Sequence, residues 1–234
     1  MMVWLEGDAK RGSSEVCSSI FEFLLLTNLS NYEQIRSFSD CCSGQNRNRQ
    51  LICFTMYVCN MFGIKSWEHQ FLESGHTYLP NDRDFGLIGK RAKHANAYSL
   101  EQWISIIESA RVKNPFKVTN MKSKFRNFES LVNSRKLVHS RTTATTKFSF
   151  SKLCYFKVEK NSDDVYYRDC DSDVLHKLDY QRFNCDVDEV IGAKNASEKI
   201  AAPKYQDLMS MLDLIPDKFK KFYIDLPHKI ACNC

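Results

Sequence analysis

Three aspartates in two separate segments, Asp40, Asp82 and Asp84, could act together on a phosphate ester. Two-metal phosphoryl transfer uses carboxylates from separate segments to hold paired divalent ions, which activate a water or hydroxyl and stabilise the leaving oxygen. Carboxylate oxygens suit Mg²⁺ or Mn²⁺. The sequence thus predicts a Mg²⁺ or Mn²⁺ site with Asp40 and Asp82 as metal ligands, and with Asp84 as the less favoured alternative to Asp82.

Each of these aspartates also has an ordinary structural role open to it. Asp40 follows an expected strand and can cap the next turn, while Asp82 can cap the start of a helix, which Asp does very often. On spacing alone, we favour these structural roles over catalysis.

A polar turn after Asp40 could bind phosphate through Gly44, Gln45, Asn46 and Arg47. Backbone amides at a helix start and nearby guanidinium groups are suited to an anion. A polar, Gly-containing turn before a helix is also ordinary connecting structure. His76 could assist at a metal or phosphate, although a hydrogen bond that fixes its own loop is the favoured role.

Hydrophobic periodicity predicts the elements that position these residues. Apolar residues recur at helical spacing in the first helix, at Val16, Ile20, Phe23 and Leu24, and alternate in a strand at Trp67, His69 and Phe71. The first expected helix is capped by Ser13 or Ser14 and includes Leu24, and the other expected helices cover residues 47–62, 81–94, 100–111 and 205–214. The expected strands cover residues 1–5, 32–38, 64–71, 148–158 and 165–167.

Strands and helices alternate over residues 1–95, which predicts an α/β layer with helices covering the sheet. In such a layer the loops at the strand ends meet, and Asp40 could approach Asp82. The polar segment 140–146 suggests a boundary between a domain of residues 1–140, with a helical extension, and a small α+β module of residues 141–234.

Charge is unevenly distributed along the 234 residues. Residues 111–141 contain nine lysines and arginines and one acid, whereas residues 161–190 contain three basic residues and nine acids. The basic segment favours a phosphate backbone as partner, or else forms a solvated face. This gives a second hypothesis, a non-enzymatic DNA- or RNA-binding module with Phe116 and Phe125 stacking on bases and phosphate contacts from Lys113, Lys117, Lys122, Lys124 and Arg126.

A third hypothesis is a protein-interaction module that uses the acidic stretch 163–189. The composition, 43% hydrophobic and 26% charged, indicates a packed domain rather than a disordered or fibrous chain. The ten cysteines include no Cys-x-x-Cys pair, and no secretory signal opens the chain. We therefore expect reduced thiols in an intracellular protein, with Cys53 and Cys59 buried as small hydrophobes. No apolar run reaches the length of a membrane span.

Several motifs resemble an uncharacterised domain family that is abundant in insects and other invertebrates and is similar to transposon-encoded proteins of ribonuclease H-like fold. They are Trp4–Gly7 with Lys10–Ser13, Ser39–Asn48, Gly75–Thr77 and Pro80–Phe85. The resemblance implies a ribonuclease H-like mixed sheet with flanking helices, an ancestral activity of metal-dependent nucleic-acid cleavage or strand transfer, and a nuclear location.

Under this resemblance, Asp40 takes the second acidic position of the site, and Asp82 or Asp84 the third. The chain departs from the family in two places. The first acid of the fold lies on an opening strand that would precede Met1, and Gly89 stands where members tend to have an acid. We therefore expect a truncated or decayed copy that lacks its first strands, is inactive, retains weak divalent-metal binding and has an exposed sheet edge.

Overall fold

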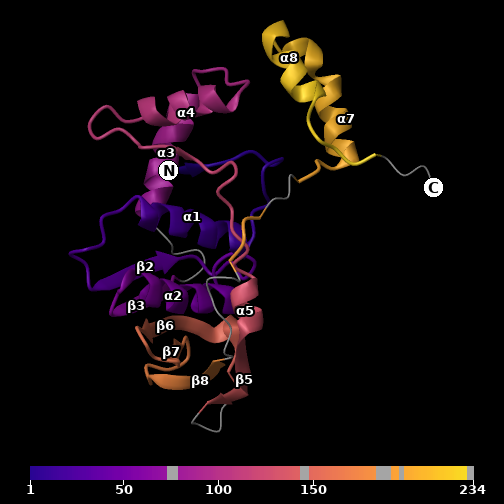
Figure 1. Ribbon diagram of the computed structural model, residues 1–234. Helices are drawn as coiled ribbons and strands as arrows, with labels where there is room; N and C mark the ends of the chain where they lie inside the picture. The colour runs from indigo at the N-terminus through magenta and orange to yellow at the C-terminus, as the bar shows by residue number, and fades with distance from the viewer. Residues whose placement is uncertain (73–78, 143–147, 183–190, 195–197, 231–234) are drawn as a thin grey trace. The chain divides into compact units, whose positions relative to one another are not determined.

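A computed structural model describes residues 1–72, 79–142, 148–182, 191–194 and 198–230 of the protein (Figure 1). The chain forms two compact units that alternate along the sequence. Unit 1 consists of Met1–Lys10, Tyr78–Ser123 and Asn195–Cys234, and unit 2 consists of Arg11–Thr77 and Lys124–Lys194.

Unit 2 is built around a six-stranded mixed sheet with the order β2-β3-β6-β7-β8-β5. Strands β2 and β3 are parallel and are joined through helix α2, while every other pair of neighbours is antiparallel. The strands are β2 (Gln34–Ser39), β3 (Ser66–Phe71), β5 (Arg135–Thr142), β6 (Leu153–Glu159), β7 (Asp164–Asp169) and β8 (His176–Arg182). Strand β2 lies at one edge of this sheet and β5 at the other.

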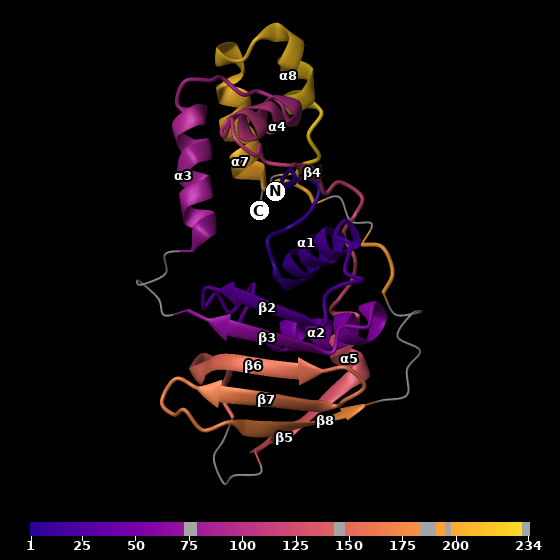
Figure 2. The same ribbon diagram turned by 90° about the vertical axis from the view of Figure 1, so that its left-hand side faces the viewer.

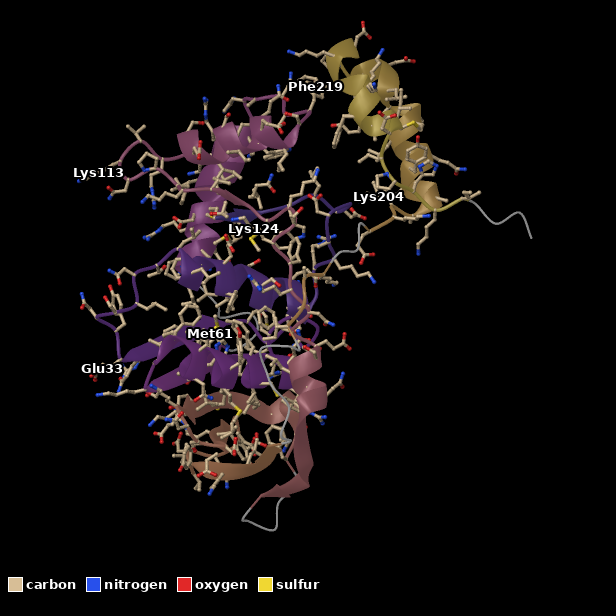
Figure 3. The ribbon with its side chains drawn as sticks, viewed as in Figure 1. Glu33, Met61, Lys113, Lys124, Lys204 and Phe219 are labelled. Carbon is tan, nitrogen blue, oxygen red and sulfur yellow. The ribbon has the colours of Figure 1, made fainter. Side chains whose placement is uncertain are left out.

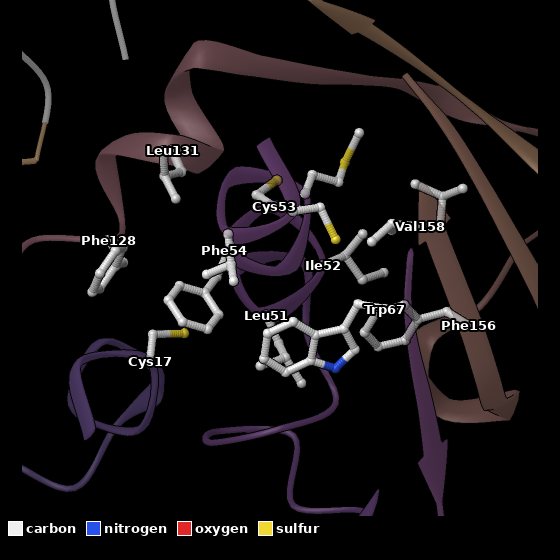
Figure 4. Close-up of a cluster of buried hydrophobic side chains, with 14 of the residues drawn as sticks. Cys17, Leu51, Ile52, Cys53, Phe54, Trp67, Phe128, Leu131, Phe156 and Val158 are labelled. Carbon is white, nitrogen blue, oxygen red and sulfur yellow. The ribbon is translucent and has the colours of Figure 1, made fainter. Parts of the chain in front are cut away.

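Helices α1 (Ser13–Leu25), α2 (Arg49–Phe62) and α5 (Ser130–Ser134) belong to unit 2, which also has a 3-10 turn, η1 (Phe150–Lys152). Helix α2 runs through the centre of the hydrophobic core, where it packs against the sheet (Figure 4). The ring of Phe54 lies edge-on to Phe128, with 4.9 Å between the centroids, and also contacts Trp67. The helix ends at Gly63, whose positive φ of 72° suits a residue without a Cβ.

The two faces of the sheet differ because side chains alternate along each strand. Trp67, Phe156, Val158 and Val165 point toward the core and are buried. The intervening side chains point to the opposite face, where most of them are half-buried or exposed, as at Tyr155, although Ser66 is buried. Figure 2 looks onto this opposite face, and α2 lies on the far side of the strands.

In its described residues, unit 1 combines a two-stranded parallel ladder with four helices and a 3-10 turn. These elements are β1 (Met2–Val3), β4 (Thr119–Asn120), α3 (Pro80–Ala92), α4 (Leu100–Ser109), α7 (Ala202–Ser210), η2 (Leu212–Leu214) and α8 (Asp217–Ile224). Phe219 of α8 stacks on Tyr98 with 5.6 Å between the ring centroids (Figure 3). The hydroxyl of Tyr223 donates a hydrogen bond of 3.0 Å to the carbonyl of Tyr98.

The structure confirms the mixed α/β class and most of the predicted helices and strands. The predicted apolar stripe of α1 is correct at Leu24, which is buried, and at Ile20, which packs against the core, but it is wrong at Phe23. Phe23 is 55% exposed, and the buried apolar residues are Cys17, Phe21 and Leu24. Phe21 occupies the core because it packs against Phe128, with 5.5 Å between the rings. None of the described helices combines the length and the apolar character that a membrane span requires.

The expected boundary near residue 140 does not coincide with the division into units. It falls within β5, and strands from both sides of it pair in one sheet, because β6 is hydrogen-bonded to β3. Long-range strand pairing joins segments that the sequence separates. Strands β5 and β8 and helix α8 were not predicted.

Candidate functional site

Asp40 lies immediately after β2, at the carboxyl end of the parallel strand pair, and is exposed. Its Oδ1 accepts a hydrogen bond of 2.8 Å from Nδ2 of Asn46 and one of 3.2 Å from the amide of Cys42. The carboxylate therefore caps the turn that follows the strand, which is the structural alternative predicted for it.

The turn after Asp40 folds around a single carbonyl. The carbonyl oxygen of Cys42 accepts hydrogen bonds from the amides of Gln45, Asn46 and Arg47, at 3.2, 2.7 and 3.1 Å. Three of the amides that could have cradled a phosphate are thus already engaged within the turn. The phosphate-binding prediction for this segment consequently depends on the side chain of Arg47 and on Gly44.

Asn48 fixes the start of α2. Its Oδ1 accepts a hydrogen bond of 3.0 Å from the amide of Leu51 and one of 3.1 Å from the hydroxyl of Ser13, while its Nδ2 donates to the carbonyl of Ser43 at 3.0 Å. Asn is among the most favoured residues at this position because its side chain satisfies a free amide of the first turn. The same side chain therefore caps α2 and ties it to α1.

The N-termini of α1 and α2 meet at the carboxyl end of β2. Besides the contact between Ser13 and Asn48, Nε2 of Gln50 donates to the hydroxyl of Ser14 at 2.7 Å. Nε2 of Gln45 donates to the carbonyl of Arg11 at 3.0 Å. Both helix dipoles have their positive ends here, which favours negative charge nearby.

The other two predicted catalytic aspartates belong to unit 1 and have partners of their own. Oδ2 of Asp82 accepts a hydrogen bond of 3.0 Å from the amide of Leu79, which caps α3. Asp84 forms an ion pair with Arg111, with 3.5 Å between Oδ1 and Nη1. Asp40 and Asp82 are thus carried by separate units, and no group of three His, Cys, Asp or Glu residues in the described part of the chain could hold a metal ion.

The predicted basic set is also divided. Lys113, Lys117 and Lys122 are exposed residues of unit 1, whereas Lys124 and Arg126 belong to unit 2. Lys124 forms an ion pair with the half-buried Glu22, and the guanidinium of Arg126 lies 5.0 Å from the centroid of the Phe21 ring. These two cations contribute to packing in unit 2.

The prediction that Phe116 and Phe125 stack on bases was wrong. Their side chains are only 7% and 3% exposed. Burial of an aromatic side chain stabilises the folded state strongly. This stabilisation keeps both rings inside the protein, although the neighbouring lysines and arginines suggested that the rings are exposed. His76 lies outside the described residues.

His69 is a buried polar residue whose environment the alternation of Trp67, His69 and Phe71 did not predict. His69 is 5% exposed and lies between two serines of β2, with Nδ1 2.6 Å from Oγ of Ser37 and Nε2 3.0 Å from Oγ of Ser39. Desolvation by burial lowers the pKa of His69 from 6.5 to about 4. The imidazole is therefore neutral near pH 7.

The surrounding hydrogen bonds assign the tautomer of His69. Nε1 of Trp67 donates to Ser37 at 2.7 Å, and the hydroxyl of Ser39 donates to the carbonyl of Asp40 at 2.9 Å. Ser37 is then the donor to Nδ1, and Nε2–H donates to Ser39. A continuous hydrogen-bonded chain thus runs from Trp67 to the backbone of Asp40 and fixes edge strand β2 against β3.

Burial also explains the cysteines of the core. Cys53 and Cys59 are fully buried, as predicted, and desolvation raises the pKa of Cys59 to about 12. The cysteines in the described part of the chain are free thiols.

Comparison with known proteins gives one match. No curated protein and no solved structure matches the chain. Residues 13–173 match the family described as Domain of unknown function (DUF7869). The match includes α1, the Asp40 turn, α2 and the sheet as far as β7, together with α3 and α4. Since it spans more than half of the sequence, the chain belongs to the DUF7869 family.

Proposed function

We propose that this protein binds nucleic acid through its phosphate backbone and descends from a ribonuclease H-like, transposon-encoded enzyme whose metal-dependent cleavage it no longer performs. The observation that carries the proposal is that the N-termini of α1 and α2 meet and that three arginines, Arg11, Arg47 and Arg49, lie at these two helix starts in the chain. Within the described residues, none of the three forms an ion pair. Guanidinium groups and helix N-termini both favour phosphate oxygens.

The rigidity of the turn supports this role. The amides of Gln45, Asn46 and Arg47 share the carbonyl of Cys42, and Asn48 joins the turn to both helices. Arginines held on a fixed backbone lose less conformational freedom when they bind, so more of the interaction energy appears as affinity. The basic residues of unit 1, Lys113, Lys117 and Lys122, are proposed as additional phosphate contacts.

The arrangement of the carboxylates supports binding rather than cleavage. Asp40 and Asp82 each cap a local turn, and Asp84 is paired with Arg111. The ancestry is supported by the aspartate that follows β2 in a strand-helix-strand unit, the position that the family resemblance implies for a ribonuclease H-like site. A weak affinity of Asp40 for Mg²⁺ or Mn²⁺ is proposed as a remnant of the ancestral site.

Fluorescence anisotropy with labelled DNA and RNA over a series of salt concentrations tests the proposal. The double substitution Arg47→Gln/Arg49→Gln should weaken binding about tenfold or more at 0.1 M salt and reduce the salt dependence by about two released ions. The matched control is Lys65→Gln/Lys152→Gln, which removes the same charge from exposed residues of unit 2 that already have acidic partners. An equal loss in both variants would mean that only net charge matters and would reject the arginine site.

Metal dependence separates the proposal from the enzymatic alternative. We expect the affinity to be the same in EDTA and in 1 mM Mn²⁺, and the nucleic acid to stay intact. Cleavage that requires Mn²⁺ and disappears in Asp40→Asn would establish catalysis instead. That substitution keeps a side-chain oxygen to accept the bonds from Cys42 and Asn46, so loss of folding should not confuse the result.

A further inference from the structure

The strands of the unit 2 sheet run side by side in Figure 2. Their registers place aromatic and cationic residues in two rows across the face that points away from the core. The first row is formed by Phe38, Gln70, Tyr155 and Arg168. The second row is formed by Arg36, Glu68, Lys157, Tyr166 and Lys177. We call these nine residues the platform.

The three aromatic rings of the platform come from three different strands. Phe38 is 58% exposed, and Tyr155 and Tyr166 are half-buried. Strand β3 separates Phe38 from Tyr155, which places their Cα atoms about 10 Å apart, and Tyr155 and Tyr166 are about 8 Å apart by the same strand spacings. Phe38 and Tyr166 therefore provide two separate aromatic surfaces on this face, and the ring of Tyr155 provides a third that it shares with the guanidinium of Arg168.

Arg168 adds a second kind of stacking surface. Its guanidinium lies over the ring of Tyr155, with 4.3 Å from Cζ to the centroid. Within the described residues, Arg168 has no carboxylate partner and its buried Nε has no hydrogen-bond partner. Guanidinium planes and aromatic rings are the two surfaces on which proteins stack splayed nucleic-acid bases.

The charge of the platform suits a polyanion. Its described residues include four cations and one carboxylate, Glu68, whereas Glu159 and Asp164 lie at the opposite end of the same face. The cationic rows therefore occupy the part of the face nearest the carboxyl end of β2, where the turn with Arg47 begins. The platform and the proposed phosphate site thus belong to the same unit and lie toward the same end of β2.

The ion pairs on the platform do not prevent this role. Arg36 pairs with Glu68 at 3.4 Å, Lys157 with Glu159 at 2.7 Å and Lys177 with Asp164 at 2.9 Å. Exposed pairs of this kind contribute little net stability. Phosphate oxygens can therefore replace these carboxylates at small cost.

We propose that the platform binds single-stranded nucleic acid, with bases stacked on Phe38, Tyr155 and Tyr166 and the backbone held by the neighbouring cations. The inference rests on the proposed function, because it assumes that unit 2 binds nucleic acid at all. It adds that the preferred form is a single strand, since the bases of a duplex are stacked on each other and cannot reach the rings.

The test compares a fluorescein-labelled dT12 strand with a 12-bp duplex, using the full chain in fluorescence anisotropy. Phe38→Leu, Tyr155→Leu and Tyr166→Leu each remove a ring but keep an apolar side chain of similar reach. Each should weaken dT12 binding about fivefold or more and leave duplex binding nearly unchanged. The matched control is Tyr32→Leu, which removes an exposed ring of unit 2 that lies outside the platform.

Two results would overturn the platform and are distinguishable from each other. If the three leucine variants bind dT12 as tightly as the unmodified chain while Arg47→Gln/Arg49→Gln binds weakly, nucleic-acid binding stands and the platform is rejected. If neither the strand nor the duplex binds at 50 mM salt, the platform and the proposed function both fail. Thermal melting of each variant by circular dichroism verifies that the compared proteins are folded.

Discussion

Phe156 and Tyr155 are neighbours on β6, yet they lie on opposite faces of the sheet and have different roles. Phe156 is fully buried and stacks on the ring of His69, with 5.3 Å between the centroids. Tyr155 is half-buried and carries the guanidinium of Arg168 on its ring. Similar aromatic side chains thus serve packing on one face and present a stacking surface on the other.

The difference between the faces lies in how polar groups are satisfied. On the covered face, His69 is neutral and is held between Ser37 and Ser39. On the open face, the charges are paired at the surface, as in Arg36 with Glu68. Buried polar groups are costly to disturb, whereas exposed pairs exchange readily with other ions. We therefore expect stability to depend mainly on the covered face and ligand binding mainly on the open face.

The largest expected difference in the free energy of unfolding is between Phe156→Ala and Tyr155→Ala. Phe156→Ala should reduce the free energy of unfolding by about 3–5 kcal/mol, because it leaves a cavity in a closed core. Tyr155→Ala should cost about 1 kcal/mol, mainly the loss of the contact with Arg168. Urea denaturation followed by circular dichroism measures both. Equal losses in the two variants would show that the open face is packed as tightly as the core.

His69 should make stability depend on pH. Its folded pKa of about 4 lies below the ordinary 6.5, so between these values the unfolded chain binds a proton that the folded chain does not. The stabilisation is present above pH 6.5 and is lost as the pH falls toward 4. By linkage, the free energy of unfolding should fall by about 2 kcal/mol between pH 7 and pH 5 from this residue.

The comparison with His69→Phe isolates this contribution. The variant keeps an aromatic ring beside Phe156 and leaves Ser37 bonded to Trp67, but it cannot be protonated. Its unfolding free energy should change less than that of the unmodified chain between pH 7 and pH 5. His94→Gln, at an exposed position, is the control and should retain the full dependence. An unchanged pH profile in His69→Phe would mean that His69 has the same pKa in the folded and the unfolded chain.

Local patterns in the sequence were sufficient for the first half of the fold. The apolar stripe of α2 and the alternation of Trp67, His69 and Phe71 located both elements to within a few residues. Strand β8 was missed because it contains several charged residues, and because its pairing with β5 joins segments that are separated by β6 and β7. Such non-local pairing is stabilised by tertiary contacts that no short window of sequence contains.

For the candidate site too, local contacts were predictable from the sequence and long-range ones were not. The cap by Asp82 depends on residues three positions apart and was foreseen, as was the turn role of Asp40. The approach of Asp40 to Asp82 was an inference from strand order, and the two residues belong to separate units. The burial of Phe116 and Phe125 could not be predicted from the sequence. Lysines close to them in the chain suggest an exposed segment, but they do not show whether the phenylalanine rings themselves face the solvent or the core.

The smallest expected effect on stability is at the pair of Arg36 and Glu68, whose side chains are 69% and 26% exposed. Arg36→Gln and Glu68→Gln should each change the free energy of unfolding by less than about 0.5 kcal/mol, because exposed pairs are screened by water and salt. Their effects on dT12 affinity should be opposite in sign. Arg36→Gln removes a phosphate contact and weakens binding, whereas Glu68→Gln frees Arg36 and strengthens binding by up to about fivefold. A loss of affinity in both variants would mean that the intact ion pair, and not Arg36 alone, is needed for binding. The open face would then depend on its ion pairs for its structure, and stability and binding would not be separated between the two faces.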